Sequence, residues 1–145
     1  MAYSGKYNPR NPQKYMGDHT KIIYRSSWEC RVMDWLDKDD NIISWSSEEI
    51  IIPYVSPVDG RYHKYYPDFL VKSKNSQGKI TTMMIEVKPK HQTMPPVQPK
   101  RKTRKFITEV MTYGVNQAKW KAAEEYCLDR GWTFRVLTED DLGIT

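Results

Sequence analysis

The middle of the sequence limits the possible folds most, because it contains three strand-like segments separated by two turn signals. The segment over 49–55 is rich in branched residues. The pair Asp59-Gly60 predicts a turn into a second strand over 62–72, and a polar run after it predicts another turn into a third strand over 79–88. Because strands that are neighbours in sequence usually pair, we expect a three-stranded antiparallel meander.

A helix is expected before these strands. Ser26 is a suitable N-cap and Glu29 follows three positions later, so the capping-box pattern predicts a helix that runs to about Lys38. The apolar stripe of this helix consists of Val32, Met33 and Leu36. At helical spacing from these residues, Glu29 lies at the margin of the core-facing surface.

Helical patterns return after the strands. We expect helices over 103–113 and 116–128, then a glycine that fits a C-terminal cap and a last strand over 132–137. This order of elements predicts an α/β (α+β) fold around one sheet. At 145 residues the chain has the length of one domain, and we expect an irregular basic and aromatic arm over 1–20 and a single domain over 21–145.

A basic, proline-rich loop is expected at about 89–105. The stretch from Lys88 to Lys105 contains seven Lys or Arg residues and four prolines but no acidic residue, in a chain of net charge +5. The loop is either a solvated segment kept soluble by its charge or a surface that binds phosphates. The candidate DNA contacts are Lys90, Lys100, Arg101, Lys102, Arg104 and Lys105. No stretch approaches the ~18 consecutive apolar residues of a membrane span, so we expect no membrane partner.

Two acidic residues and a lysine stand on the second and third expected strands. Glu86 and Lys88 are two positions apart and therefore point to the same face of their strand, which Asp68 reaches if the two strands pair. One or two carboxylates bind Mg²⁺ together with substrate phosphates, and a lysine can orient or deprotonate the attacking water. The alternatives are an exposed ion pair between Glu86 and Lys88 and a strand-entry role for Asp68.

Pro67-Asp68 and Glu86-Val87-Lys88 resemble the two halves of the motif that defines the PD-(D/E)XK nuclease superfamily. The resemblance implies a restriction-endonuclease-like core, with a central mixed sheet that includes an antiparallel meander and is flanked by helices. Over most of its length the sequence resembles the head completion nucleases of tailed bacteriophages, and more loosely it is similar to the TnsA transposon-end nucleases. The segments that resemble the head completion nucleases include 24–29, 50–54, 85–90, 95–97 and 116–123.

The resemblance implies roles for individual residues. Asp68 and Glu86 would bind Mg²⁺, for which Mn²⁺ is a substitute, Lys88 would support the nucleophilic water, and Glu29 would complete the acidic cluster. Helix capping is an equally complete explanation of Glu29. Nucleases of this superfamily often place a polar residue on the helix after the lysine motif, and Gln117 or Lys119 would fill that role. Lys119, also a candidate DNA contact, is alternatively a solvent-facing lysine beside a core tryptophan.

The resemblance also implies a function. We expect a Mg²⁺-dependent endonuclease that hydrolyses phosphodiester bonds in double-stranded DNA and acts in phage head completion after DNA packaging, at head-tail joining. Its partners would be double-stranded DNA and head or portal proteins, and it would be found in the host cytoplasm during assembly or in the virion. Two alternatives stay open: a non-catalytic structural head completion or DNA-binding protein, and a junction-resolving or restriction-type nuclease that needs a dimer to cut paired strands.

Overall fold

The computed structural model describes residues 3–144 and is built around one four-stranded sheet. The strands of this sheet are β3 (Ile42–Ser47), β6 (Phe69–Lys74), β7 (Ile80–Val87) and β8 (Thr133–Leu137). They lie in the order β3-β6-β7-β8, with antiparallel pairing from β3 to β7 and parallel pairing between β7 and β8. The expected α+β class with a central mixed sheet is therefore confirmed.

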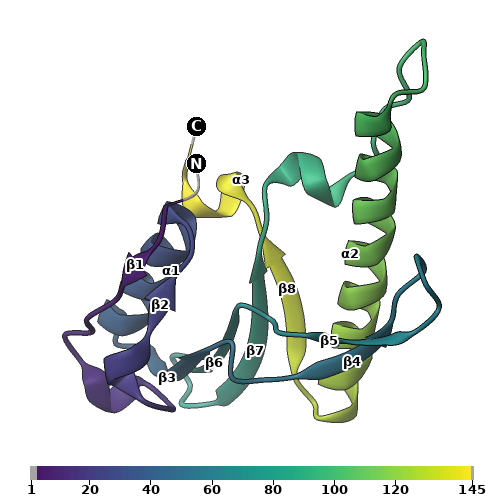
Figure 1. Ribbon diagram of the computed structural model, residues 1–145. Helices are drawn as coiled ribbons and strands as arrows, with labels where there is room; N and C mark the ends of the chain where they lie inside the picture. The colour runs from purple at the N-terminus through teal and green to yellow at the C-terminus, as the bar shows by residue number, and fades with distance from the viewer. Residues whose placement is uncertain (1–2, 145) are drawn as a thin grey trace.

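Both faces of the sheet are covered (Figure 1). One face packs against α1 (Ser27–Lys38), and the other packs against α2 (Arg104–Asp129) and a hairpin made of β4 (Ile52–Val55) and β5 (Tyr62–Tyr65). The other elements are β1 (Gly5–Lys6), β2 (Ile23–Tyr24), α3 (Glu139–Leu142) and the 3-10 helices η1 (Pro12–Lys14), η2 (His19–Lys21) and η3 (Lys90–Thr93). Each face of the sheet has its own apolar core.

The first helix forms as its sequence predicts. Ser26 is the N-cap, and its hydroxyl oxygen accepts a hydrogen bond from the Glu29 backbone N–H at 3.1 Å. The predicted stripe of Val32, Met33 and Leu36 is fully buried against the sheet. A satisfied cap and an apolar face together fix both the start and the orientation of α1.

The predicted strand over 62–72 is wrong as a single strand. It is divided into β5 and β6 around Pro67, and β5 pairs with β4 in a separate hairpin while β6 enters the main sheet. Proline has no N–H to donate to a ladder, so a strand that reaches it readily ends there. The meander therefore consists of β3, β6 and β7, and the segment over 49–55 lies outside it.

Two further elements differ from the expectation. β3 was not predicted, because the serines within Ile42–Ser47 weaken its apolar pattern, although Trp45 is almost fully buried. The two expected helices over 103–113 and 116–128 are one continuous helix, because Gly114 costs helix stability without breaking the hydrogen-bond ladder. No helix within residues 3–144 is both long and apolar enough to cross a membrane.

The N-terminal segment packs against the rest of the chain. Tyr7 and Tyr15 are buried in the core under α1, where both rings contact Trp45 edge to face. Asp37 of α1 is completely buried and accepts hydrogen bonds from the backbone N–H groups of Arg10 and Asn11, at 2.9 and 3.1 Å. These contacts hold the segment even though its own regular structure is short.

Candidate active site

The two strand carboxylates meet at one end of the main sheet. Phe69 of β6 pairs with Ile85 of β7, so one further step along the antiparallel register places Asp68 across from Glu86. Asp68 Oδ2 accepts a hydrogen bond from the Val87 backbone N–H at 2.7 Å, which anchors the carboxylate between the two strands. The change of direction at Pro67 thus delivers Asp68 to the partner strand at the level of Glu86.

Glu86 lies on the α2 side of the sheet, as strand alternation predicts. It is only 6% exposed, and its Oε1 accepts a hydrogen bond of 2.7 Å from the Tyr65 hydroxyl. Its Oε2 lies 3.8 Å from the Lys88 ammonium. The alternative of an exposed ion pair does not describe this arrangement, because the carboxylate is buried and held by a second partner.

Both carboxylates are electrostatically unfavourable when charged. Burial raises the pKa of Asp68 well above its usual range, and the nearby negative charge of Glu86 raises it further. Burial also raises the pKa of Glu86, against the opposing effects of the Tyr65 hydrogen bond and the positive charges of Lys88 and Lys119. Like-charged buried groups of this kind are common at functional sites.

Glu29 reaches the same cluster from the first turn of α1. Its half-buried carboxylate is close enough to Asp68 to contribute to the raised pKa of that residue. Burial, and to a smaller degree the charge of Glu48, raises the pKa of Glu29 itself. The Ser26 hydroxyl accepts a hydrogen bond from the Glu29 backbone N–H and donates one of 3.4 Å to Glu29 Oε2. The Glu29 carboxylate therefore takes part in the helix cap and also acts on the charge of Asp68.

Lys119 and Gln117 of α2 point in different directions. Lys119 Nζ lies 5.7 Å from the ring centroid of Tyr65 and 5.8 Å from that of Tyr54, which places its charge near Glu86. Gln117 instead lines a separate pocket with Phe134 and other residues near β8. The structure therefore brings Lys119 to the cluster and leaves Gln117 away from it.

Comparisons with known proteins identify the family of this chain. A family model described as "TnsA-like endonuclease N terminal" matches residues 39–139, which include Asp68, Glu86, Lys88 and Lys119. This chain belongs to the TnsA-like endonuclease family. The head completion nuclease of Enterobacteria phage T4 is 45% identical over 146 residues, which cover 98% of this chain and 95% of that protein. Both resemblances expected from the sequence are confirmed.

The TnsA-like fold positions the basic loop outside the carboxylate cluster. Lys90 is engaged by α3, where its ammonium lies 3.0 Å from Asp140 and its backbone N–H donates to Glu139 at 2.6 Å. Lys105 forms an exposed ion pair with Glu109 at 3.9 Å. The other basic residues of the loop and the start of α2 are exposed, namely Lys100, Arg101, Lys102 and Arg104. This region projects past the end of the sheet (Figure 1).

Two residues near the TnsA-like site were not identified from the sequence. Tyr65 holds Glu86, and its own pKa is raised by burial and by the Glu86 charge, so it stays a hydrogen-bond donor. Asn116 is 5% exposed and lines the same pocket as Lys88 and Lys119. A usable signal was the three-residue spacing of Asn116 and Lys119, which places both on one helix face.

The donor atoms of this TnsA-like site suit a hard divalent cation. Within residues 3–144 no three His, Cys, Asp or Glu side chains stand together as a preformed metal cluster. Asp68 and Glu86 instead offer two carboxylates beside Lys88, whose side chain is 31% exposed, and Mg²⁺ is typically bound by one or two carboxylates with substrate phosphates. The raised pKa values of the two groups fit a site whose repulsion a cation relieves.

Proposed function

We propose that this protein is a Mg²⁺-dependent DNA endonuclease that hydrolyses phosphodiester bonds during phage head completion, after DNA packaging. The observation that carries the proposal is the opposed pair Asp68 and Glu86, with the Lys88 ammonium 3.8 Å from Glu86 Oε2. Membership of an endonuclease family and similarity to a protein named for head completion support the reaction and its setting.

Asp68 and Glu86 would hold the metal ion, with Glu29 at the margin of the cluster. Bound there, Mg²⁺ or Mn²⁺ would offset the repulsion between the carboxylates and stabilise negative charge on the phosphate under attack. Tyr65 fixes the orientation of Glu86, and the Val87 backbone N–H fixes that of Asp68. These two hydrogen bonds keep the carboxylate oxygens that would bind the metal in place before DNA binds.

Lys88 and Lys119 would act on the substrate side of the cluster. The Lys88 side chain is 31% exposed, so its ammonium contacts Glu86 and solvent together and is placed to orient the attacking water. Lys119 rests over two tyrosine rings and offers its charge to a phosphate of the cleaved strand. Each lysine therefore has a position suited to its role.

Double-stranded DNA would be held mainly through its phosphates. The exposed loop residues Lys100, Arg101, Lys102 and Arg104 supply positive charge beyond the end of the sheet, and Lys90 and Lys105 add to it from ion pairs at the surface. Phosphate contacts position a duplex without reading its sequence and weaken as salt rises. We therefore propose cleavage with little base preference.

The setting would be an infected host cell, with head or portal proteins as further partners and with the assembled virion as a second location. The rival functions are a non-catalytic head completion or DNA-binding protein and a junction-resolving or restriction-type nuclease. A non-catalytic protein has no need of two adjacent carboxylates whose pKa values are both raised by burial, so the site favours an enzyme.

The deciding experiment incubates purified protein with supercoiled plasmid in Mg²⁺, in Mn²⁺ and in EDTA. We expect nicking or cutting in both metals and none in EDTA. Glu86→Ala should abolish the cleavage, whereas Glu125→Ala, which removes an exposed carboxylate on α2, should retain it. Equal cleavage by wild type and Glu86→Ala would assign the activity to a contaminant, and DNA binding without cleavage under all conditions would favour the non-catalytic rival.

A further inference from the structure

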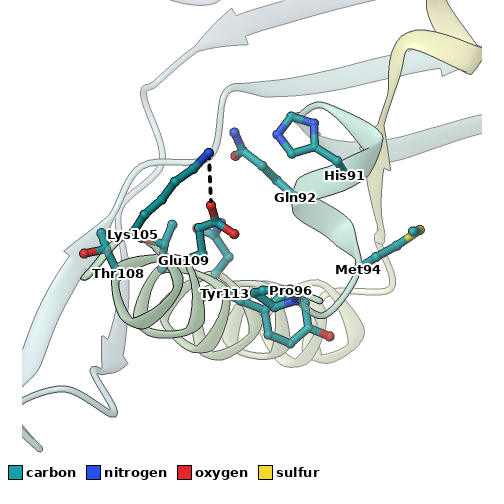
Figure 2. Close-up of a pocket in the computed structure, with 10 residues that line it drawn as sticks. His91, Gln92, Met94, Pro96, Lys105, Thr108, Glu109 and Tyr113 are labelled. Carbon is teal, nitrogen blue, oxygen red and sulfur yellow. Dashed lines mark ion pairs between the residues drawn. The ribbon is translucent and has the colours of Figure 1, made fainter. Parts of the chain in front are cut away.

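Two adjoining pockets separate η3 from the first half of α2. One, of about 480 Å³, contains the active-site lysines Lys88 and Lys119. The other, of about 360 Å³, lies next to it and is shown in Figure 2. The two pockets share four lining residues, Gln92, Thr108, Thr112 and Asn116. A ligand bound at the lysines can therefore extend directly into the second pocket.

The second pocket differs chemically from the lysine pocket. Its apolar wall comes from Met94, Pro96 and Tyr113, and its polar groups include the amides of Gln92 and Asn116. Figure 2 shows His91 and Gln92 of η3 facing α2 across this space, with the Lys105–Glu109 ion pair at one side. An aromatic and apolar wall with amide groups suits a flat heterocycle that has hydrogen-bonding edges.

The position of Asn116 is a second observation that points to a ligand. Only 5% of its surface is exposed, and it lines both pockets. Within residues 3–144 the fully enclosed side-chain atoms without a hydrogen-bond partner are Trp45 Nε1 and Trp120 Nε1, and the Asn116 amide is instead reached from the two pockets that it lines. Buried amides are normally hydrogen-bonded, so one that is reached from a pocket is available to a bound molecule.

We propose that this second pocket, which we name the base pocket, receives an unpaired nucleobase next to the phosphate that Lys119 contacts. The proposal rests on the nuclease function and specifies its substrate as DNA with an unpaired nucleotide beside the cleaved bond, such as a nick, a flap or a tailed end. An engineered cavity of about 150 Å³ holds benzene, so the larger base pocket has room for a planar base.

The physical reason for this preference is the cost of unstacking. A base inside an intact duplex must leave its stack and its partner to enter a side pocket, whereas an unpaired base has already lost its partner. Stacking on an aromatic ring such as Tyr113 then favours the unpaired base whatever its identity. The enzyme would therefore recognise DNA structure and remain tolerant of sequence.

Equilibrium binding in EDTA tests the proposal without cleavage. The probes are a blunt duplex and the same duplex with a short single-stranded tail on either strand, carrying 2-aminopurine at the first unpaired position. We expect one tailed duplex to bind at least about 5-fold more tightly than the blunt duplex, the lower limit of base-aromatic stacking. The fluorescence of 2-aminopurine should also change when this complex forms.

Three variants separate the base pocket from general DNA binding. Tyr113→Ala removes the aromatic wall and Met94→Ala removes part of the apolar wall. Neither residue lines the lysine pocket, so each variant should lose the preference for the tail while still binding the blunt duplex. Gln117→Ala, which changes a residue that lines a separate pocket with Phe134, should keep the preference. Equal binding of tailed and blunt DNA by the wild type, or a preference retained in both pocket variants, would overturn the proposal. The plasmid cleavage assay is independent of this result, so failure of the nuclease function would be recognised separately.

Discussion

Asp37 and Glu86 are both buried carboxylates, but they lie in regions of opposite character. Asp37, in the core region under α1, has each oxygen paired with a backbone N–H of the N-terminal segment. Glu86, on the α2 face, has one oxygen bound to Tyr65 and the other 3.8 Å from Lys88, and it faces Asp68. The carboxylate of Asp37 thus completes its hydrogen bonds within the fold. Glu86 and Asp68 together carry negative charge that a bound cation can offset.

The comparison teaches that burial alone does not identify a functional carboxylate. A buried carboxylate that receives enough hydrogen bonds stabilises the structure around it. A buried carboxylate next to a second one destabilises the charged state of both, and this cost is tolerated where an ion or a substrate offsets it. Substitutions at the two places should therefore separate stability from activity.

The largest effect is expected at the catalytic cluster. Asp68→Ala and Lys88→Ala should each lower the rate of plasmid cleavage by about 10²–10⁴-fold, the range typical of lost acid-base or nucleophile-positioning groups. Both variants should stay folded and bind DNA as the wild type does, because neither side chain belongs to an apolar core. Cleavage rate, circular dichroism and DNA binding check this together. Unfolding of both variants would contradict the assigned geometry.

The next effect should appear at Asp37 and in stability. Asp37→Ala leaves the N–H groups of Arg10 and Asn11 without their acceptor, so we expect a loss of about 2–4 kcal/mol in the free energy of unfolding. Cleavage per folded molecule should be unchanged at a temperature where the variant is folded. Urea denaturation gives the first quantity. If Asp37→Ala were as stable as the wild type, the structural role that distinguishes Asp37 from Glu86 would be contradicted.

A smaller effect should follow loss of the Tyr65 hydroxyl. Tyr65→Phe keeps the buried ring but removes the 2.7 Å hydrogen bond to Glu86, and we expect kcat to fall about 10-fold with little change in KM. Tyr62→Phe is the matched control, because Tyr62 is on the same strand and 79% exposed. A raised requirement for Mg²⁺ in Tyr65→Phe alone would separate positioning of Glu86 from simple packing. Identical kinetics in both variants would exclude the positioning role.

The smallest effect concerns pH and stability without metal. The pKa values of Asp68, Glu86 and Glu29 are all raised by burial in the folded protein, which therefore binds more protons than the unfolded chain. Their contribution to stability is complete below the ordinary carboxyl pKa of about 4 and is lost as pH rises through the raised values. In EDTA we expect Asp68→Asn to lose less stability than the wild type as pH rises. At neutral pH its free energy of unfolding should exceed that of the wild type by about 1 kcal/mol. Parallel stability curves for the two proteins would contradict this sign.

The site could be predicted from the sequence more fully than the strand pairing. The alternation of Ile85, Glu86 and Val87 placed the carboxylate opposite the apolar neighbours, and the structure has this arrangement. Strand pairing depends on which segments meet in three dimensions. The serines of Ile42–Ser47 weaken its apolar pattern, so the sequence does not indicate a central strand there. In the sequence Pro67 is recognisable as part of the Pro-Asp motif. In the structure it also lies in the break between β5 and β6.

Contacts between distant segments account for what was missed at the site. Tyr65 touches Glu86 only because the hairpin folds back over the sheet, and no local pattern predicts this. The spacing of Asn116 and Lys119 places both on one helix face, but helix periodicity does not indicate that this face meets η3. Local alternation predicted the face of Glu86, and the expected pairing of the second and third strands is present as β6 and β7, whereas the contacts of the hairpin and of η3 were not predicted.

The hairpin of β4 and β5 has a consequence for how this enzyme can diversify. It interrupts the chain between β3 and β6 but takes no place in the main sheet, so its turn at Asp59 and Gly60 can lengthen or shorten without shifting the register of any central strand. At its base Tyr65 holds Glu86, and in its turn Val58 lines the pocket of Lys88 and Lys119. Changes in the turn can therefore remodel the wall of that pocket while the strands that carry Asp68 and Glu86 keep their register.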